Sequence, residues 1–565
     1  MSLELLRQLP PFPAEIGSRM PTAHVDTFAA DHMPAADDLP EFLFELPELQ
    51  FPERINCATA LLDARLAAGD GERACLLAPG IRWTYRELQA RVDRIAHVLV
   101  NDLGVVPGNR VLLRGANHPT LVACWFAVMK VGAIAVTTMP MLRAKELGTM
   151  ISIAKITHAL CDESLLDELH AAQVANPFLT TVCAYHSAAA DGLEGRMAAF
   201  DEPFTSVDTA ATDTCLLAFT SGTTGIPKAT MHSHRDVMAI CACWPHSVLR
   251  ASPDDLFAGS PPLAFTFGLG GVVLFPLSIG ASALLLEKVS PPHLLEGVRE
   301  FGVTVLFTAP TSYRAMAALL TADEQSARAL RLRKCVSAGE ALPAATRQLW
   351  RDTTGIELID GIGATEMLHI FISASEQDSR PGATGKPVPG YRAEVVDDDG
   401  IPVPVGTVGK LRVKGPTGCR YLRDERQRAY VRDGWNYTGD AYLIDADGYF
   451  HYQARLDDII ISSGYNIAGP EVENVLLQHP AVAECGVAGV PDDERGQLVK
   501  AWVVLRPGYE ADADMVRALQ EFVKSTVAPY KYPRAVSFVS ALPRTNTGKL
   551  QRFRLRDLDG PAVVT

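Results

Sequence analysis

The stretch Phe219-Thr220-Ser221-Gly222-Thr223-Thr224-Gly225-Ile226-Pro227-Lys228 indicates how the chain is organised. Its two glycines permit a tight turn, its three threonines and one serine offer hydrogen-bond donors, and Lys228 adds a positive charge. Such a loop suits a polyanion, and we interpret it as a loop that binds nucleotide phosphates. The alternative is a plain solvated turn, which is common for Ser/Gly/Thr clusters between apolar runs.

The residues on both sides of this loop predict regular structure. Asp213–Phe219 is typical of a buried strand, and Ser233–Val237 is able to begin a helix. Strand, glycine loop and helix in this order form the usual phosphate-binding context. A Walker-type P-loop is excluded, because two residues separate Gly225 from Lys228 and Ala229 follows where that motif requires Ser or Thr.

The composition predicts a soluble globular enzyme with several subdomains. The chain has 565 residues, of which 48% are apolar and 21% charged, and it exceeds the size that one core normally serves. Its formal charge of −14 argues against sequence-independent binding of nucleic acid, which needs an excess of Lys and Arg.

Cysteine usage and the first residues favour a cytoplasmic location. Eleven scattered cysteines without a C-x-x-C pair indicate reduced thiols rather than a disulfide framework or a zinc site. Met1–Arg7 has no basic head followed by an apolar core, so we expect no secretory signal. The charge-free run Leu256–Leu286 is as long as a membrane span, but prolines and glycines divide it into buried strand and helix pieces, so we expect no membrane partner.

Alternating strand and helix patterns predict the α/β class. Ile81–Leu88 reads as a strand followed by a helix, with Thr84 as its cap and Glu87 at the third helical position. Further elements are expected as helices at 56–66 and 119–131 and as strands at 109–114, 132–138, 256–259, 283–286, 303–308 and 334–337. This pattern indicates doubly wound parallel sheets with helices on both faces.

The chain is predicted to divide into two domains, 1–456 and 457–565. Residues 1–49 form an arm that is either packed over the core or partly loose. Short strands and turns from Arg392 onward indicate a small β subdomain at about 390–456. The remaining tail has its own strands at 485–490 and 501–505 and a helix at 512–523, so it could fold alone.

Four turns contain candidate chemical groups. Asp360–Glu366 combines glycines with a hydroxyl and a carboxylate, which makes Glu366 the candidate Mg²⁺ contact; a capped helix start is the alternative. Ser337–Pro343 is a small-residue turn that a flat ligand can approach. The carboxylate of Asp440 can accept both hydroxyls of a ribose, and Lys549 can stabilise charge at an α-phosphate, although each alone is commonly a turn or loop residue.

Five of these motifs occur in the order known from the AMP-forming adenylating superfamily, which the chain resembles from about Trp83 to Arg552. This superfamily contains acyl-CoA synthetases, luciferases and carrier-protein adenylation domains. The resemblance implies a large amino-terminal lobe, a small mobile carboxy-terminal α+β domain, and the use of ATP, Mg²⁺ and coenzyme A.

The resemblance also assigns roles to individual residues. Lys549 is implied as the catalytic residue, Glu366 as the metal contact and Asp457 as the hinge, while Gly464 and Tyr465 border the pantetheine channel. Contacts to ATP or AMP are implied for Thr220, Ser221, Gly222, Thr223, Thr224, Lys228, Gly339, Glu340, Ala341, Asp360, Gly361, Ile362, Thr365, Asp440 and Arg455. The chain departs from the pattern at Ile362, where an aromatic residue commonly stacks on adenine, and at Ile461, where many relatives have Lys.

The acyl pocket is predicted at Pro262–Gly271. Phe265, where many relatives have His, and Phe267 suit a flat apolar slot for an aromatic ring, or else they pack the core. The sequence of residues 361–371 resembles that of benzoate- and 2-aminobenzoate-CoA ligases. In that interpretation Ala338 borders the substrate, and His369 lines the slot and bonds a ring substituent.

Three functions remain open from the sequence. The first is an aryl-CoA ligase that acts on benzoate or 2-aminobenzoate, with a small aromatic acid and CoA as partners, as a monomer or homodimer. The second is a standalone adenylation enzyme that loads a carrier protein. The third, a non-catalytic nucleotide-binding regulator, is disfavoured because Lys549, Glu366 and Asp440 are all present.

Overall fold

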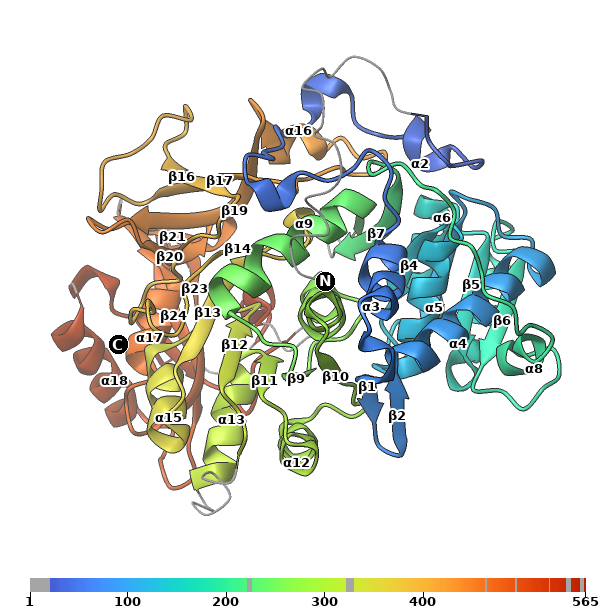
Figure 1. Ribbon diagram of the computed structural model, residues 1–565. Coiled ribbons are helices and arrows are strands. Elements are labelled where there is room, and N and C mark those ends of the chain that lie inside the picture. Colours follow the sequence, from blue (N-terminus) through green and yellow to red (C-terminus); the bar gives the residue numbers. More distant parts are fainter. Residues whose placement is uncertain are drawn as a thin grey trace.

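The computed structural model describes residues 21–220, 226–321, 330–462, 465–492, 495–527, 529–544, 550–558 and 563–564. Two large β-sheets come first along the chain, a smaller antiparallel sheet follows, and a fourth sheet belongs to the carboxy-terminal part (Figure 1). The architecture is therefore a large amino-terminal α/β domain with a small carboxy-terminal domain, as the sequence predicts.

The first large sheet contains the strand that leads into the predicted phosphate loop. Its order is β6-β5-β3-β4-β7-β8. The strands are β3 (Arg110–Arg114), β4 (Ile134–Thr138), β5 (His158–Asp162), β6 (Thr181–Tyr185), β7 (Thr214–Thr220) and β8 (Lys228–Ser233). All neighbours are parallel except β7 and β8, which pair antiparallel.

The predicted helix start at Ser233 is confirmed, but a strand that the sequence did not predict, β8, lies between the loop and this helix. Helix α9 (His234–Trp244) begins only after β8, with a capping box formed by Ser233 and Asp236. Residues 229–233 are buried, and their pairing with β7 satisfies backbone groups that would otherwise lose their hydrogen bonds in the core. The predicted phosphate loop therefore connects two paired strands rather than a strand and a helix.

The second large sheet has the order β15-β14-β13-β12-β11-β9-β10-β1-β2. Its strands are β1 (Ala74–Ala78), β2 (Ile81–Thr84), β9 (Leu256–Gly259), β10 (Ser282–Leu284), β11 (Val305–Thr308), β12 (Lys334–Ala338), β13 (Leu358–Gly363), β14 (Ile370–Ser373) and β15 (Lys386–Pro387). The central strands are parallel, and antiparallel pairing is confined to the two ends of the sheet. The predicted doubly wound pattern thus holds for the central strands.

The two large sheets share one hydrophobic core. Helix α5 (Pro119–Lys130) is buried along nearly its whole length and contacts β3 and β4 of one sheet and β1 of the other. A helix without a polar face is stable only when it is enclosed in this way. Helix α4 (Tyr85–His97) has the predicted capping box of Thr84 and Glu87.

The other helices are mostly peripheral. They are α2 (Phe28–Asp31), α3 (Ala64–Ala67), α6 (Ala144–Ala154), α7 (Leu166–Val174), α8 (Leu193–Met197), α12 (Pro291–Phe301), α13 (Pro310–Thr321), α15 (Ala344–Thr354), α16 (Gln427–Tyr430) and α19 (Arg552–Leu555). The charge-free run is divided as predicted, into β9, α10 (Thr266–Gly268), the π-helical turn η8 (Leu269–Leu274), α11 (Phe275–Ile279) and β10. None of the helices in the described ranges is both long enough and apolar enough to cross a bilayer.

The third sheet is antiparallel and corresponds to the predicted β subdomain. It consists of β16 (Arg392–Val396), β17 (Gly409–Lys414), β18 (Val431–Arg432), β19 (Trp435–Ile444) and β20 (Phe450–Arg455). The amino-terminal arm is packed over the core in its described part, because Thr22 donates to Asp213 at 2.5 Å and Leu49 is buried.

The carboxy-terminal sheet has a hydrophobic core of its own. It contains β21 (Ile459–Ser462), β22 (Tyr465–Ala468), β23 (Val482–Asp492), β24 (Gly496–Leu505), β25 (Ala535–Phe538) and β26 (Val563–Val564), covered by α17 (Gly469–Leu476) and α18 (Ala513–Thr526). The domain boundary at residue 457 stays a prediction.

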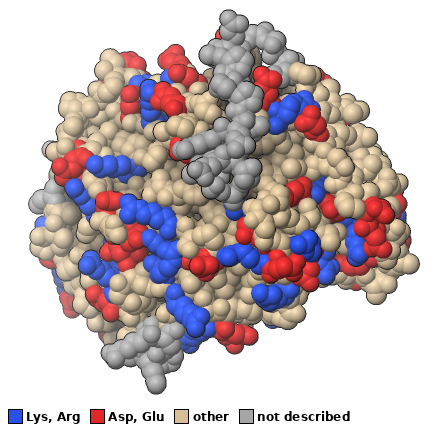
Figure 2. Space-filling model, in the orientation of Figure 1, with Lys and Arg blue, Asp and Glu red and all other residues tan. Residues whose placement is uncertain are grey.

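The charges on the face shown in Figure 2 are of mixed sign. Lys and Arg side chains alternate there with Asp and Glu, and no continuous basic surface is formed by the described residues of that face. This distribution agrees with the net charge of −14 and with a small-molecule ligand.

Candidate active site

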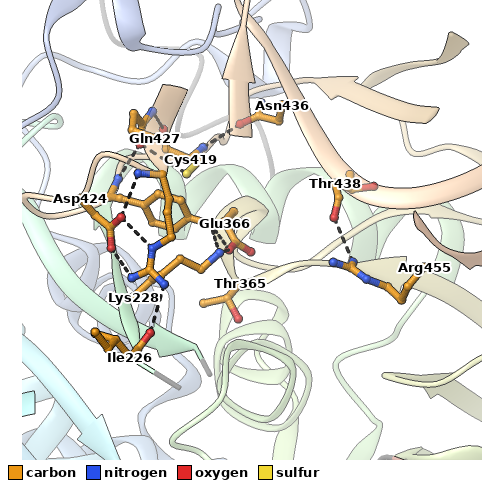
Figure 3. Close-up of polar contacts among 12 residues, drawn as sticks. Ile226, Lys228, Thr365, Glu366, Cys419, Asp424, Gln427, Asn436, Thr438 and Arg455 are labelled. Carbon is orange, nitrogen blue, oxygen red and sulfur yellow. Dashed lines mark hydrogen bonds and ion pairs between the residues drawn. The ribbon is translucent and has the colours of Figure 1, made fainter. Parts of the chain in front are cut away.

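The base of the predicted phosphate loop holds a cation beside a carboxylate. Lys228 begins β8, and its Nζ lies 2.6 Å from the Tyr421 hydroxyl and 3.4 Å from Oε1 of Glu366 (Figure 3). Thr220 is half-buried at the end of β7. The structure therefore brings together Lys228 and Glu366, which are 138 residues apart. The other predicted phosphate contacts, Ser221–Thr224, lie outside the described residues.

Glu366 lies on a short turn that links the phosphate end of the site to its acyl end. The turn begins as the 3₁₀ helix η9 (Thr365–Met367) and reverses at Leu368, whose φ is 67°. A positive φ at a non-glycine residue is uncommon, and such strain is concentrated at functional sites. The ring of His232 contacts the carbonyl of Thr365 at 2.8 Å and holds the start of the turn.

His369, at the end of this turn, is enclosed by aromatic rings. Its ring centroid lies 4.4 Å from that of Phe275 and 5.7 Å from that of Phe267, and Trp244 and Phe307 are at 6.0 and 6.5 Å. Burial lowers the pKa of His369 to about 3, so the imidazole is neutral at physiological pH. Among the described residues, no hydrogen bond of full geometry reaches either ring nitrogen, and a weaker interaction with the backbone of Phe267 only partly opposes the lowering of the pKa. A buried polar group of this kind invites a ligand contact.

The predicted acyl turn is closely packed in this structure. Phe267 contacts His369, whereas Phe265 occupies the N-cap position of α10 and forms no ring contact with His369 within the described ranges. The substrate roles of these residues stay predictions. A void of about 10 Å³ is lined by Leu121, Val122, Trp125, Thr137, Leu263, Leu269 and Val273. It has room for about one water molecule, so an aromatic ring enters only if neighbouring side chains move apart.

The predicted adenine side is formed by the ends of two adjacent parallel strands. In the register of β12 and β13, Ala338 lies opposite Gly361. The chain then turns at Gly339, whose φ of 90° suits glycine. The same edge of the sheet holds Glu340, Ala341, Asp360 and Ile362. Burial raises the pKa of the Asp360 carboxyl to about 7, although the positive charge of Arg347 acts to lower it.

The predicted ribose ligand forms an ion pair. Asp440 on β19 is opposite Arg455 on β20, and the Arg455 guanidinium donates to Oδ1 of Asp440 and to the carbonyl of Thr438, both at 3.0 Å. The pKa of the Tyr442 phenol is raised by burial first, then by Asp440, and also by Asp360. Asp440 and Asp360 therefore both act electrostatically on one buried phenol, and their roles at ribose and adenine stay predictions.

The carboxy-terminal domain reaches this edge through Arg544, whose guanidinium lies 3.8 Å from the Glu340 carboxylate. Lys549 and Gly464 lie outside the described residues. Asp457 is part of the short helix η10 (Leu456–Asp458), and Tyr465 begins β22. The roles of these four residues stay predictions.

Two contacts at the loop base could not be anticipated from sequence. Tyr421 joins Lys228 to Glu366, and Arg426 donates to the carbonyl of Ile226 at 3.1 Å. Both residues belong to an irregular stretch without a glycine turn or a strong period. Their positions depend on how that stretch pairs with β8, which no local pattern indicates.

A second cluster with metal-ligand atoms occurs away from the site. Among the described residues, potential ligand atoms of Cys57, Cys215 and His234 lie within 4.8 Å of one another in the core. The backbone N–H of Cys57 already donates to Nδ1 of His234 at 3.2 Å. Because this lone pair is in use, we interpret the cluster as packing between β7 and α9, and all eleven cysteines are free buried thiols.

Family models match both domains of the chain. The model described as AMP-binding enzyme matches residues 64–421, and the model described as AMP-binding enzyme C-terminal domain matches residues 471–549. The benzoate–CoA ligase of Thauera aromatica is 35% identical over 517 residues, which covers 90% of this chain and 97% of the relative.

Two solved structures extend the comparison to the fold. An anthranilate CoA ligase, AuaEII, solved in complex with anthranoyl-AMP, superposes with a TM-score of 0.85 at 33% identity and covers 90% of this chain and 98% of its own. A benzoate CoA ligase from Burkholderia xenovorans LB400 gives a TM-score of 0.81 at 31% identity, with 89% and 100% covered. The similarity thus includes both domains.

Proposed function

Because the chain belongs to the AMP-binding enzyme family and is an AMP-forming acid–thiol ligase, we propose that it is an aryl-CoA ligase. The reaction converts an aryl carboxylate, ATP and CoA into aryl-CoA, AMP and diphosphate through an aryl-adenylate. Benzoate and 2-aminobenzoate are the proposed acids. The names of the similar ligases, which act on benzoate or anthranilate, support this choice.

One observation carries the proposal: the turn Thr365–His369 joins a phosphate-side carboxylate to an aromatic enclosure. Glu366 contacts Lys228 at one end, and His369 enters a group of four aromatic rings at the other. A flat acid held by the rings would have its carboxylate directed toward the nucleotide phosphates. The neutral imidazole would donate to, or accept from, an amino or hydroxyl substituent on the ring.

The donor set at Glu366 fits Mg²⁺. The metal prefers a few carboxylate oxygens together with phosphates and water, and Glu366 is a nearly buried carboxylate beside the hydroxyl of Thr365. Bound there, Mg²⁺ would neutralise the departing diphosphate. Lys228 and Thr220 would hold phosphate oxygens, while Asp440 and Arg455 would bind the ribose and Gly339, Ala341 and Ile362 would border the adenine.

The carboxy-terminal domain is proposed to act in both half-reactions. Lys549 would stabilise negative charge at the α-phosphate as the carboxylate attacks. Rotation about Asp457 would then bring Gly464 and Tyr465 to the pantetheine of CoA, whose thiol attacks the adenylate. These assignments rest on the motifs of this sequence.

A product assay tests the proposed function. Purified protein is incubated with ATP, Mg²⁺, CoA and a panel of benzoates, cinnamates and fatty acids, and AMP and acyl-CoA are quantified. We expect AMP and aryl-CoA in equal amounts with benzoate or 2-aminobenzoate. Release of no AMP with any aryl acid would refute the proposal, and AMP release without transfer to CoA would favour a carrier protein as acceptor.

A further inference from the structure

The segment Cys419–Tyr430, between β17 and β18, lies along the free edge of β8. The backbone N–H of Met231 donates to the carbonyl of Arg420 at 2.8 Å, and that of Leu422 donates to Ala229 at 2.9 Å. Tyr421 forms an antiparallel bridge with Thr230. The segment therefore extends the first large sheet by a short pairing, and it places Tyr421 at the base of the predicted phosphate loop.

The hydroxyl of Tyr421 stands between a cation and a carboxylate. It accepts a hydrogen bond from Nζ of Lys228 at 2.6 Å and donates one to Oε1 of Glu366 at 2.5 Å. Lys228 also lies 4.5 Å from the centre of the Tyr421 ring.

The backbone of Tyr421 is itself fixed from behind. The amide oxygen of Gln427 accepts from the Tyr421 N–H at 2.8 Å, and its Nε2 donates to the carbonyl of Cys419 at 3.1 Å (Figure 3). The same Nε2 also donates to the carbonyl of Asp38 at 2.9 Å. Tyr421 is 1% exposed. Its hydroxyl therefore has little freedom to leave the position between the two charges.

A second contact from the same segment reaches Ile226, two residues before Lys228 at the downstream end of the loop. Arg426 pairs with Asp424 at 2.8 Å and donates to the carbonyl of Ile226 at 3.1 Å (Figure 3). Ile226 directly follows residues 221–225, which lie outside the described residues. The segment thus contacts both Ile226 and Lys228, and it ties the loop base to the turn that contains Glu366.

We propose that Tyr421 is a positioning residue for the ATP half-reaction, an inference that rests on the proposed function. Its hydroxyl acts as a spacer that keeps Lys228 and Glu366 3.4 Å apart, beyond the length of about 2.8 Å that a direct charge-assisted hydrogen bond favours. Both contacts fall on Oε1 of Glu366, so among the described residues Oε2 is the oxygen left for Mg²⁺. Without the hydroxyl, the ammonium and the carboxylate would pair directly and each would be less available to MgATP.

The test compares Tyr421→Phe with the matched control Tyr430→Phe. Tyr430 is half-buried and packs edge-on against Tyr421, but its hydroxyl has no partner among the described residues. ATP binding is titrated calorimetrically in Mg²⁺ and in EDTA. Diphosphate exchange and thioester formation from a prepared aryl-adenylate and CoA are then measured separately.

We expect Tyr421→Phe to weaken binding of MgATP and to slow exchange by roughly 10- to 100-fold, since hydrogen bonds to two charged groups are lost. Binding in EDTA should weaken by a smaller factor than binding in Mg²⁺, because only the Lys228 contact to phosphate is then affected. The thioester step should change less than about twofold, as should every measurement on Tyr430→Phe. Unchanged MgATP binding in Tyr421→Phe overturns the proposal. Equal losses in both half-reactions with a lowered melting temperature also overturn it, because they indicate a general structural role.

The same design separates this proposal from the proposed function. If the parent protein adenylates no acid, the proposed function fails, but calorimetry without any acid still reports whether MgATP binding depends on Tyr421. If the parent protein forms aryl-CoA and Tyr421→Phe binds MgATP normally, only the role of Tyr421 is refuted.

Discussion

Replacing Gly270 by Ala should disturb the acid site selectively. Gly270 lies in η8, and a Cβ atom there would stand 2.4 Å from Cδ2 of His369 and 3.0 Å from its Nε2. Ordinary carbon contacts lie at roughly 3.5–4.0 Å, so the imidazole would have to shift by about 1 Å. The Phe275 ring, 4.4 Å away between centroids, stands close enough to resist that shift.

The structure also sets the size of the effect. Overpacking of a core costs about 1–3 kcal/mol, and replacing a helical glycine by alanine returns about 1 kcal/mol, so the net loss of stability should be about 0–2 kcal/mol. Misplacing a substrate-positioning group by about 1 Å can lower the rate roughly 100-fold. We therefore expect kcat/KM for the aryl acid to fall by roughly 10- to 100-fold, with KM for ATP nearly unchanged. Steady-state AMP release at varied acid and varied ATP measures both.

Gly297→Ala provides the control. Gly297 lies on α12, away from the site, and its Cβ would stand 2.8 Å from Cδ1 of Leu286, the end of a flexible side chain. This variant should lose some stability and keep its kinetics. The reasoning is refuted if Gly270→Ala retains the parental kcat/KM for every aryl acid, or if its KM values for acid and ATP rise together.

Three further predictions concern the nucleotide and pH. Asp440→Asn removes the carboxylate that pairs with Arg455 and should weaken ATP binding about 10-fold in calorimetry, with KM for the acid unchanged; parental affinity would contradict the ribose assignment. Lys549→Ala should slow adenylation by at least about 100-fold and leave thioester formation from prepared adenylate intact, and normal diphosphate exchange would rule out its role. Burial lowers the pKa of His369 from 6.5 to about 3 and that of His232 from 6.5 to about 4. Below pH 6.5 the unfolded chain therefore binds more protons than the folded protein, and the folded state loses stability as the pH falls. Each imidazole should cost about 2 kcal/mol at pH 5, and His369→Leu should therefore lose less thermal stability between pH 7.5 and 5 than the parent; equal losses would disprove the assignment.

Local patterns were sufficient where one short stretch decides the structure. The capping box at Thr84 depends on residues three apart, and the buried strand before the loop depends on a continuous apolar run. The division of the charge-free run follows from its prolines and glycines. In each case the deciding residues are adjacent or a few positions apart, so the sequence alone predicts these features.

Features that depend on pairing between distant segments were not predictable in this way. No local pattern marks Lys228–Ser233 as a strand, and pairing with the free edge of β7 selects that conformation. The position of Tyr421 depends in turn on the free edge of β8. The motifs therefore indicated Lys228 and Glu366 but not the residue that separates them.

The turn Thr365–His369 implies that the two substrates are coupled mechanically. Glu366 is restrained by Tyr421 and Lys228, and His369 is restrained by its ring contacts, while the positive φ of Leu368 leaves the short turn between them little freedom. A shift at the aromatic end therefore changes how the acid is aligned with the phosphates, while Tyr421 and Lys228 hold Glu366 and the ATP end in place. Because attack on the α-phosphate requires acid and phosphate to be aligned together, a change in the aromatic enclosure should appear in kcat as well as in the KM for the acid. An acid site on an independent flexible loop would affect the KM alone.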